Sequence, residues 1–317
     1  MKKEKFYSYK PWLIFSVVVI SMVMITFSSV NAADLESDSY EIAPWTSNGY
    51  KDVTVSVLSE ESPAADPQDE CVLNTTDLVS HWPLNEQAGA TTFVDVVSSM
   101  NGTCQGDACP IRTFGKIGGA YTFVARDKNV ISVPADVNPG KALYDTMANG
   151  NFSAGVWVKT TQTCITGEIN NKVFFGRYRD VDINGTWWLG CKEPGGLAVF
   201  RLRDSGDTVR QIDGTSNITD GHWHYIVGVR DSGSDKNYLY VDGVLEGMLD
   251  SPLYSGNFSS DMPITMGAYD EPTPYYLDGT LDEVVLYDRV LAPNEIGTYY
   301  DACEAASAFT YIPIVKR

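Results

Sequence analysis

The clearest alternation of apolar and polar positions lies in residues 220–247, DGHWHYIVGVRDSGSDKNYLYVDGVLEG. Successive side chains of a strand point to opposite sides, so every second residue shares a face. One face here carries Trp223, Tyr225, Val227 and Val229. The polar run 230–237 and the Asp-Gly pair at 242–243 are typical of turns that reverse the chain. This stretch therefore predicts three antiparallel strands and no helix.

Short apolar segments of the same kind recur along the chain, separated by Gly, Asp and Asn. They span residues 78–82, 120–124, 130–133, 152–160, 173–178, 197–202, 264–266 and 282–287. Such a series predicts an all-β fold, an antiparallel β-sandwich of two sheets packed face to face. The helix signals that we find fall in residues 293–301, where Pro293 and Glu295 occupy the first turn and apolar residues share one side. We expect one short C-terminal helix there, covering an edge of the sandwich.

Residues 1–32 have the pattern of an export signal. Four lysines precede an apolar run from Trp12 to Phe27, and Val30-Asn31-Ala32 offers a small-residue cleavage site. The run is shorter than the roughly 20 residues that a membrane helix needs. We therefore favour a cleaved signal peptide over an uncleaved anchor. The mature protein is expected to be secreted or on the cell surface, with no membrane insertion after cleavage.

Residues 33–70 differ in composition, with ten carboxylates and one lysine. A segment with so much charge and so few large apolar residues is predicted to be a mostly disordered linker, although residues 53–57 alternate like a single edge strand. The folded domain is then expected at 71–304, followed by a tail at 305–317. The domain is long enough for one β-sandwich with a sizeable core.

The whole chain is acidic, with 23 basic and 41 acidic residues and a net charge of −18. Without residues 1–32 the numbers are 19 and 40, a net charge of about −21. This balance argues against nucleic acid and anionic membranes as partners, because both bind clustered Lys and Arg. It does not identify a partner, and it also serves solubility.

Five stretches resemble, in order, the LamG-like jelly-roll domains of the laminin G and concanavalin A-like lectin/glucanase superfamily. They are LVSHWPLNEQAGATTFVDVVSSMNGT, GKIGGAYTFVARDKNVISVP, FSAGVWVKT, the WHYIVGVRD and LYVDGVLEG arms, and LDGTLDEVVLYDRVLAPNEIGTYYDA. Together they cover about residues 71–303. The resemblance implies a concanavalin A-like jelly roll. That fold hosts lectins, glycosidases, adhesion modules and spacers, so function has to be argued from the site.

Six cysteines in an exported chain without a CxxC motif indicate disulfides before metal ligands. Cys104 and Cys109 flank one tight loop. The resemblance places the two ends of the domain side by side, which implies a bond from Cys71 to Cys303. Cys164 and Cys191 lie just outside one cluster of strands, and a bond between their loops is the third expectation.

Catalytic motifs are not evident. Glycosidases need two carboxyl groups across the scissile bond, and the ExDxxE-type strand of the family's glucanases is missing. The nearest pairs, Asp242 with Glu246 and Asp282 with Glu283, are split by a turn or point to opposite faces. His81, His222 and His224 are interpreted as structural before they are interpreted as metal ligands. We therefore expect no enzyme.

Aromatic residues in two loops give the best indication of a ligand. Exposed rings stack on sugars, and the alternative is that they fill the core. The candidates are Tyr178, Trp187, Trp188, Tyr275 and Tyr276. We expect a non-catalytic module that binds carbohydrate or a surface glycoprotein. A structural or adhesion spacer and a divergent glycan hydrolase are the alternatives.

The resemblance also implies a structural calcium ion, held by carbonyls of the opening loop and a carboxylate of the closing strand. The matching positions here are Asn85, Asn101, Gly102 and Asp282. Calcium accepts six to eight oxygen ligands, and loop carbonyls supply them without a sequence motif. Asn85 stands where related domains often have Asp, which lowers the charge of the site. The alternative is that Asp282 only caps a turn.

Overall fold

The computed structural model describes residues 71–135, 150–164, 172–177, 185–250, 254, 256–258, 260–268 and 275–309. All of them belong to one unit that spans residues 65–317. The expected signal peptide (1–32), the expected acidic linker (33–70) and residues 310–317 lie outside the described residues. In the described part of the chain, no helix is long and apolar enough to cross a membrane.

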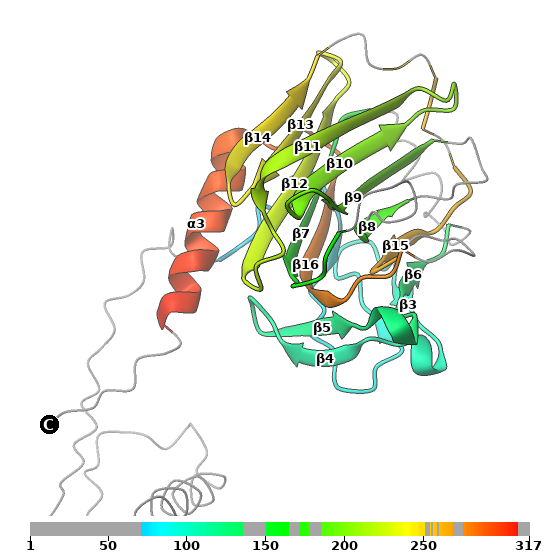
Figure 1. Cartoon of the computed structure of the whole chain (residues 1–317), viewed down its shortest axis with the longest axis vertical. Helices are drawn as coiled ribbons and strands as arrows, with labels where there is room; N and C mark the ends of the chain where they lie inside the picture. Colours follow the sequence, from blue (N-terminus) through cyan, green and yellow to red (C-terminus); the bar gives the residue numbers. More distant parts are fainter. Residues whose placement is uncertain are drawn as a thin grey trace, which may run out of the picture. The chain divides into compact units, whose positions relative to one another are not determined.

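Two eight-stranded antiparallel sheets form the fold, which confirms the predicted sandwich (Figure 1). Sheet A contains β1 (Leu78–Trp82), β4 (Ile111–Phe114), β5 (Gly119–Phe123), β7 (Phe152–Lys159), β12 (Trp223–Asp231), β13 (Lys236–Val241), β14 (Val244–Leu249) and β16 (Gly279–Tyr287). Its strand order is β14-β13-β12-β7-β16-β5-β4, and β1 also pairs with β16.

Sheet B contains β2 (Thr92–Phe93), β3 (Gly102–Thr103), β6 (Ile131–Val133), β8 (Lys172–Arg177), β9 (Thr186–Lys192), β10 (Leu197–Arg203), β11 (Val209–Asn217) and β15 (Ile264–Met266). Its order is β11-β10-β9-β8-β15-β6-β3-β2. Two single turns of 3-10 helix, Gly106–Ala108 and Ala125–Asp127, and the α-helix α3 (Pro293–Phe309) complete the described elements.

The main core lies between the sheets. Phe152 of sheet A meets Trp187 of sheet B with ring centroids 5.3 Å apart, and Phe200 packs beside them at 6.2 Å from Phe152. Gly228 of β12 faces Phe200 so closely that an added Cβ would lie 2.5 Å from its Cδ2 atom. A larger residue at 228 would therefore force the two sheets apart.

Helix α3 packs on the outer face of sheet A, not along the edge where the sequence analysis placed it (Figure 1). Trp157 stacks on Tyr300 of the helix with centroids 5.6 Å apart, and Tyr225 meets Tyr299 at 5.0 Å. The pattern of β12 shows why, because Tyr225, Val227 and Val229 point away from the main core and need a second cover. The helix also ends at Phe309 and not at Asp301. The alanines that follow Asp301 are strong helix formers and extend it.

This helix is held in place by contacts from the N-terminal end of the domain, from the segment before the helix and from the β4–β5 turn. A disulfide joins Cys71 to Cys303. Arg289 donates two hydrogen bonds of 2.8 Å to the carboxylate of Glu295, and the Asn74 amide donates a third bond of 2.7 Å. Near the other end of the helix, Lys116 forms an ion pair with Glu304 at 2.5 Å. The expected neighbourhood of Cys71 and Cys303 is therefore present.

Several strands lie where the sequence predicts them, and others were not predicted. β1 and β15 have the expected bounds, and β5 to β8, β10 and β16 differ by a few residues. β9 and β11 were not predicted as strands, and neither were the short β2, β3 and β4. The segment TWWLG of β9 was read as a loop, but its apolar run is that of a strand buried on both faces.

Candidate functional site

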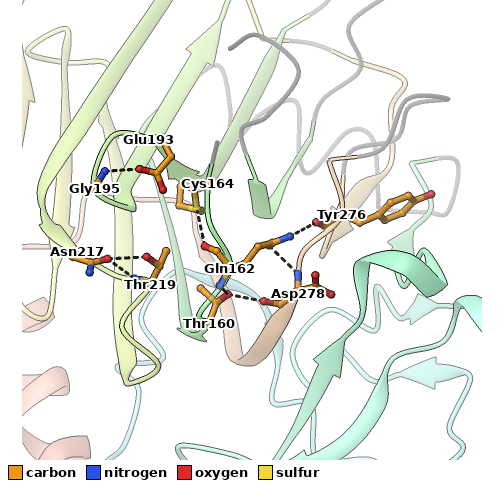
Figure 2. Close-up of a disulfide and its surroundings, with 10 residues drawn as sticks. Thr160, Gln162, Cys164, Glu193, Gly195, Asn217, Thr219, Tyr276 and Asp278 are labelled. Carbon is orange, nitrogen blue, oxygen red and sulfur yellow. Dashed lines mark hydrogen bonds between the residues drawn. A yellow bond between two sulfur atoms is a disulfide. The ribbon is translucent and has the colours of Figure 1, made fainter. Parts of the chain in front are cut away.

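Four loops meet at one end of the sandwich around the disulfide between Cys164 and Cys191 (Figure 2). Residues 160–164 leave β7, residues 193–196 join β9 to β10, residues 218–222 join β11 to β12, and residues 275–278 lead into β16. The disulfide ties the first of these loops to strand β9. The remaining expected bond, Cys104 to Cys109, is also present.

Gln162 holds the segment that precedes β16. Its side-chain nitrogen donates to the carbonyl of Tyr276 at 3.1 Å, and its side-chain oxygen accepts the backbone N–H of Asp278 at 2.9 Å (Figure 2). The Thr160 hydroxyl donates to the carbonyl of Asp278 at 2.5 Å. One amide side chain thus pairs with residues 276 and 278 as a neighbouring strand would, and it ties this segment to the loop that follows β7.

The neighbouring turns are held by short side-chain bonds. Glu193 accepts the backbone N–H of Gly195 at 2.6 Å. Asn217 accepts both the backbone N–H and the hydroxyl of Thr219, at 2.9 and 2.8 Å. Gly196, with a φ of +62°, lies against Thr219, where an added Cβ would be 2.2 Å from the Thr219 hydroxyl oxygen. These polar side chains form a rigid rim around the loop end.

Only one of the four described ring candidates projects from this rim. Tyr276 is partly exposed, and Figure 2 shows its ring pointing away from Gln162. Tyr275 is 7% exposed and packs with Val173, Trp188 and Val199 on the outer face of sheet B. Tyr178 lies outside the described residues.

Trp187 and Trp188 correct the sequence analysis, which placed both in an exposed loop. They are 1% and 0% exposed, because β9 lies between β8 and β10 and is covered on both faces. Trp187 points into the main core, and Trp188 lies under Tyr275 on the outer face. Neither ring can stack on a ligand without unfolding its surroundings.

The four residues expected to hold calcium lie in two separate places, each with its own hydrogen bonds. Asn85 accepts the backbone N–H of Gly119 at 2.5 Å, and Asp282 accepts that of Ile117 at 2.9 Å, so both hold the turn between β4 and β5. Asn101 instead accepts the backbone N–H of Asp95 at 3.0 Å, and Gly102 lies in β3. Among the described residues, no group of three or more His, Cys, Asp or Glu side chains is arranged to hold a metal.

Asp282 is nonetheless an unusual carboxyl group. It is fully buried, and burial raises its pKa to about 8, although backbone N–H groups of the adjacent turn act in the opposite direction. A cation beside it would relieve that cost, since an opposite charge favours the ionised form. Calcium at this position stays a prediction.

The histidines and the remaining carboxylate pairs have structural contacts. His81 lies 2.7 Å from Glu283. His224 lies 2.7 Å from Asp242 and 3.1 Å from Asp220. Burial alone would lower the pKa of His224, but the two carboxylates outweigh it and the pKa is raised.

Glu246 accepts backbone N–H groups of Thr215 and Ser216 on β11, at 2.8 and 3.2 Å. Asp242 contacts His224. Both carboxylates of the Asp242 and Glu246 pair are therefore bound to groups of the sheets. Carboxylates engaged in this way position strands and turns.

Gln162, Thr160 and Asp278 form the centre of the loop end, and the sequence did not predict them as site residues. Gln162 and Tyr276 are 114 positions apart, and no local periodicity links them. The only signal was the polar run TTQTC directly after a buried strand. Such a run is typical of any loop.

Comparisons with known proteins agree with this architecture. The family model described as the concanavalin A-like lectin/glucanases superfamily matches residues 131–297. A search of curated proteins found no match. One similar solved structure is domain 4 of AbnA, a GH43 extracellular arabinanase from Geobacillus stearothermophilus, in complex with arabinotriose. The two are 19% identical with a TM-score of 0.51, over 71% of this chain and 98% of that one.

Two toxin structures are also similar to this chain. The binding domain of Paraclostridial Mosquitocidal Protein 1 is 14% identical, with a TM-score of 0.54, over 71% of this chain and 52% of that one. A structure of botulinum neurotoxin type C, whose cell entry depends on interaction with two ganglioside molecules, is 13% identical, with a TM-score of 0.53, over 72% of this chain and 52% of that one. The match spans about half of each toxin chain.

Proposed function

The chain belongs to the concanavalin A-like lectin/glucanase superfamily, and from this premise we propose that it is an exported, non-catalytic module that binds carbohydrate or a surface glycoprotein. The site is the loop end around Cys164 and Cys191. The observation that carries the proposal is the partly exposed ring of Tyr276 on a segment that Gln162 holds in place.

The loop end is preorganised to bind a sugar. A ring covers the apolar face of a pyranose, and a sugar's hydroxyl groups need donors and acceptors around that ring. Asp278, two positions after Tyr276 in the chain, is exposed and supplies a carboxylate, while Glu193, Asn217 and Thr219 lie on the other side of Gln162 from the ring (Figure 2). Because Gln162 already fixes the segment, binding costs little additional conformational entropy.

The similar structures are compatible with this proposal. The arabinanase domain was solved with arabinotriose, and the toxin depends on gangliosides. Export is supported by the signal-like residues 1–32 and by three disulfides, which persist in oxidising compartments. A non-catalytic role is supported by Asp242 and Glu246, whose oxygens accept backbone N–H groups of the sheets.

A glycan array probed with the exported chain tests the proposal. For any glycan that binds, Tyr276→Ala should weaken the affinity at least tenfold, equivalent to about 1.4 kcal/mol. Phe114→Ala is the matched control, since Phe114 is 86% exposed on strand β4, away from the loop end. Tyr276→Ala should keep the wild-type thermal unfolding.

Two outcomes favour the alternatives. A wild-type chain that binds no glycan on the array supports the structural or adhesion spacer. Release of product from a bound glycan, abolished by Asp282→Asn or Glu283→Gln, supports a divergent hydrolase. Equal losses for Tyr276→Ala and Phe114→Ala would place the binding site elsewhere on the domain.

A further inference from the structure

The two edge strands of sheet A, β14 and β4, have different neighbours. At one edge, β14 lies against β11 of sheet B, and the Glu246 side chain accepts two N–H groups of that strand. At the other edge, β4 is the last strand in the order, and in the described part of the chain it pairs with β5 alone. A strand in this position presents unpaired backbone N–H and C=O groups.

The open edge is also apolar. Phe114 is 86% exposed, the largest exposed fraction among the large apolar side chains of the described residues, and Ile111 is 60% exposed. Native edge strands are often short or carry charged residues, proline or a bulge that prevents another strand from adding. β4 is short and contains Arg112, but the Arg112 side chain donates to the carbonyl of Glu86 at 2.8 Å, and the apolar Ile111 and Phe114 stay exposed. Ile111 and Phe114 are three residues apart, so they lie on opposite faces of β4. A cover for this edge must therefore bring apolar groups to both faces.

Helix α3 passes close to the turn that follows this edge strand. Lys116 lies in the turn that follows β4, and its side chain pairs with Glu304 of the helix at 2.5 Å. From Glu304 the helix continues to Phe309, a distance of about 7.5 Å at 1.5 Å per residue. The chain therefore leaves the helix within reach of the β4–β5 turn.

The residues that follow have the composition of a strand. The sequence of residues 310–314 is TYIPI, with aromatic and β-branched side chains. Extended, these residues span about 17 Å, against about 13 Å for the four residues of β4. In an extended chain Tyr311 points to one face and Ile312 and Ile314 to the other. Pro313 is compatible with an outermost strand, where its missing N–H faces solvent.

We propose that residues 310–314 add a strand to the open edge of sheet A, beside β4, and cover Ile111 and Phe114. The segment then becomes the new edge of the sheet. Its proline prevents a further strand from adding, so this arrangement also protects the protein against association through β4.

Hydrogen exchange read by mass spectrometry tests the proposal on the full chain and on a variant that stops after Phe309. We expect the amides of β4 to exchange at least tenfold faster in the shortened chain, while those of β12 and β14 keep their rates. Identical rates at β4 in the two proteins would overturn the proposal.

A point variant guards against a shortened chain that does not fold. Ile312→Asp should release β4 in the same way, because a charge cannot pack against the edge. Val244→Asp is the matched control, since Val244 is 63% exposed at the other edge. Protection of β4 that rises with protein concentration would identify a second copy as the occupant and would also overturn the proposal.

Discussion

The outer faces of the two sheets each carry a buried aromatic cluster, but the clusters are covered by different means. On the helix-covered face, Trp157 and Tyr225 lie under α3, which a disulfide and the Arg289–Glu295 pair fasten to the sheet. On the loop-covered face, Trp188 lies under Tyr275, and the segment that carries Tyr275 is held by Gln162. The first arrangement contributes mainly to stability. The second places a partly exposed ring, Tyr276, directly beside its buried neighbour.

The largest expected effect is the loss of unfolding free energy when the disulfide at each face is removed. The bond from Cys71 to Cys303 spans 232 positions and that from Cys164 to Cys191 spans 27. In the chain-entropy treatment their loss costs about 5 and about 3.5 kcal/mol. Paired Cys→Ser variants, unfolded in guanidinium, should follow that order. A smaller loss for the pair at 71 and 303 would show that the fastening of α3 matters little.

The next largest effect is expected from replacing the buried tryptophan of each face, Trp157 or Trp188. Trp157 contacts the rings of Tyr225 and Tyr300, and Lys116 lies 4.8 Å above its ring. We expect Trp157→Ala to lower the free energy of unfolding by about 4 kcal/mol, with a smaller loss for Trp188→Ala, which empties a smaller cluster. Only Trp188→Ala should also weaken glycan binding, through Tyr275. Glycan binding lost equally in both variants would contradict this division.

Acid should loosen the helix-covered face. The Arg289 guanidinium lowers the pKa of Glu295 to about 2, from an ordinary value of 4.5, although partial burial opposes it. A carboxyl group whose folded-state pKa is depressed stabilises the fold above about pH 4.5, and that stability is lost as the pH falls towards 2. Solvent screens this partly exposed pair, so the linkage amounts to about 1 kcal/mol. Unfolding curves of wild type and Glu295→Gln should differ at pH 7 and converge near pH 2, and parallel curves would refute the pairing.

Calcium should produce a similarly small effect. Because the folded-state pKa of Asp282 is about 8, well above its ordinary value of 3.8, its contribution to stability falls as the pH rises from about 4 to 8. An ion that binds only the folded state adds about 1.4 kcal/mol at ten times its dissociation constant. In thermal melts at pH 8, calcium should then raise the melting temperature of wild type by about 3 to 6 °C relative to chelator. Asp282→Asn should abolish that shift, and a shift that survives the substitution would place the ion elsewhere.

Much of the sandwich could be predicted from the sequence because its strands are local patterns. The alternation of Tyr225, Val227 and Val229 predicts β12, but it does not show that this face lies outside the main core and under α3. The resemblance to LamG-like domains added the neighbourhood of Cys71 and Cys303. Apolar runs without alternation, such as TWWLG, were ambiguous between a loop with exposed rings and a doubly covered strand.

What the sequence determined by itself was therefore part of the set of strands, the sandwich class and the two turns after β12. The tertiary structure decided which rings are covered, because the exposure of Trp188 and Tyr276 depends on strands and loops that lie far from them in the chain. It also decided that α3 covers a sheet face and that Gln162 holds the segment before β16. These are contacts between residues more than 70 positions apart, and such contacts leave no periodic trace in the sequence on either side.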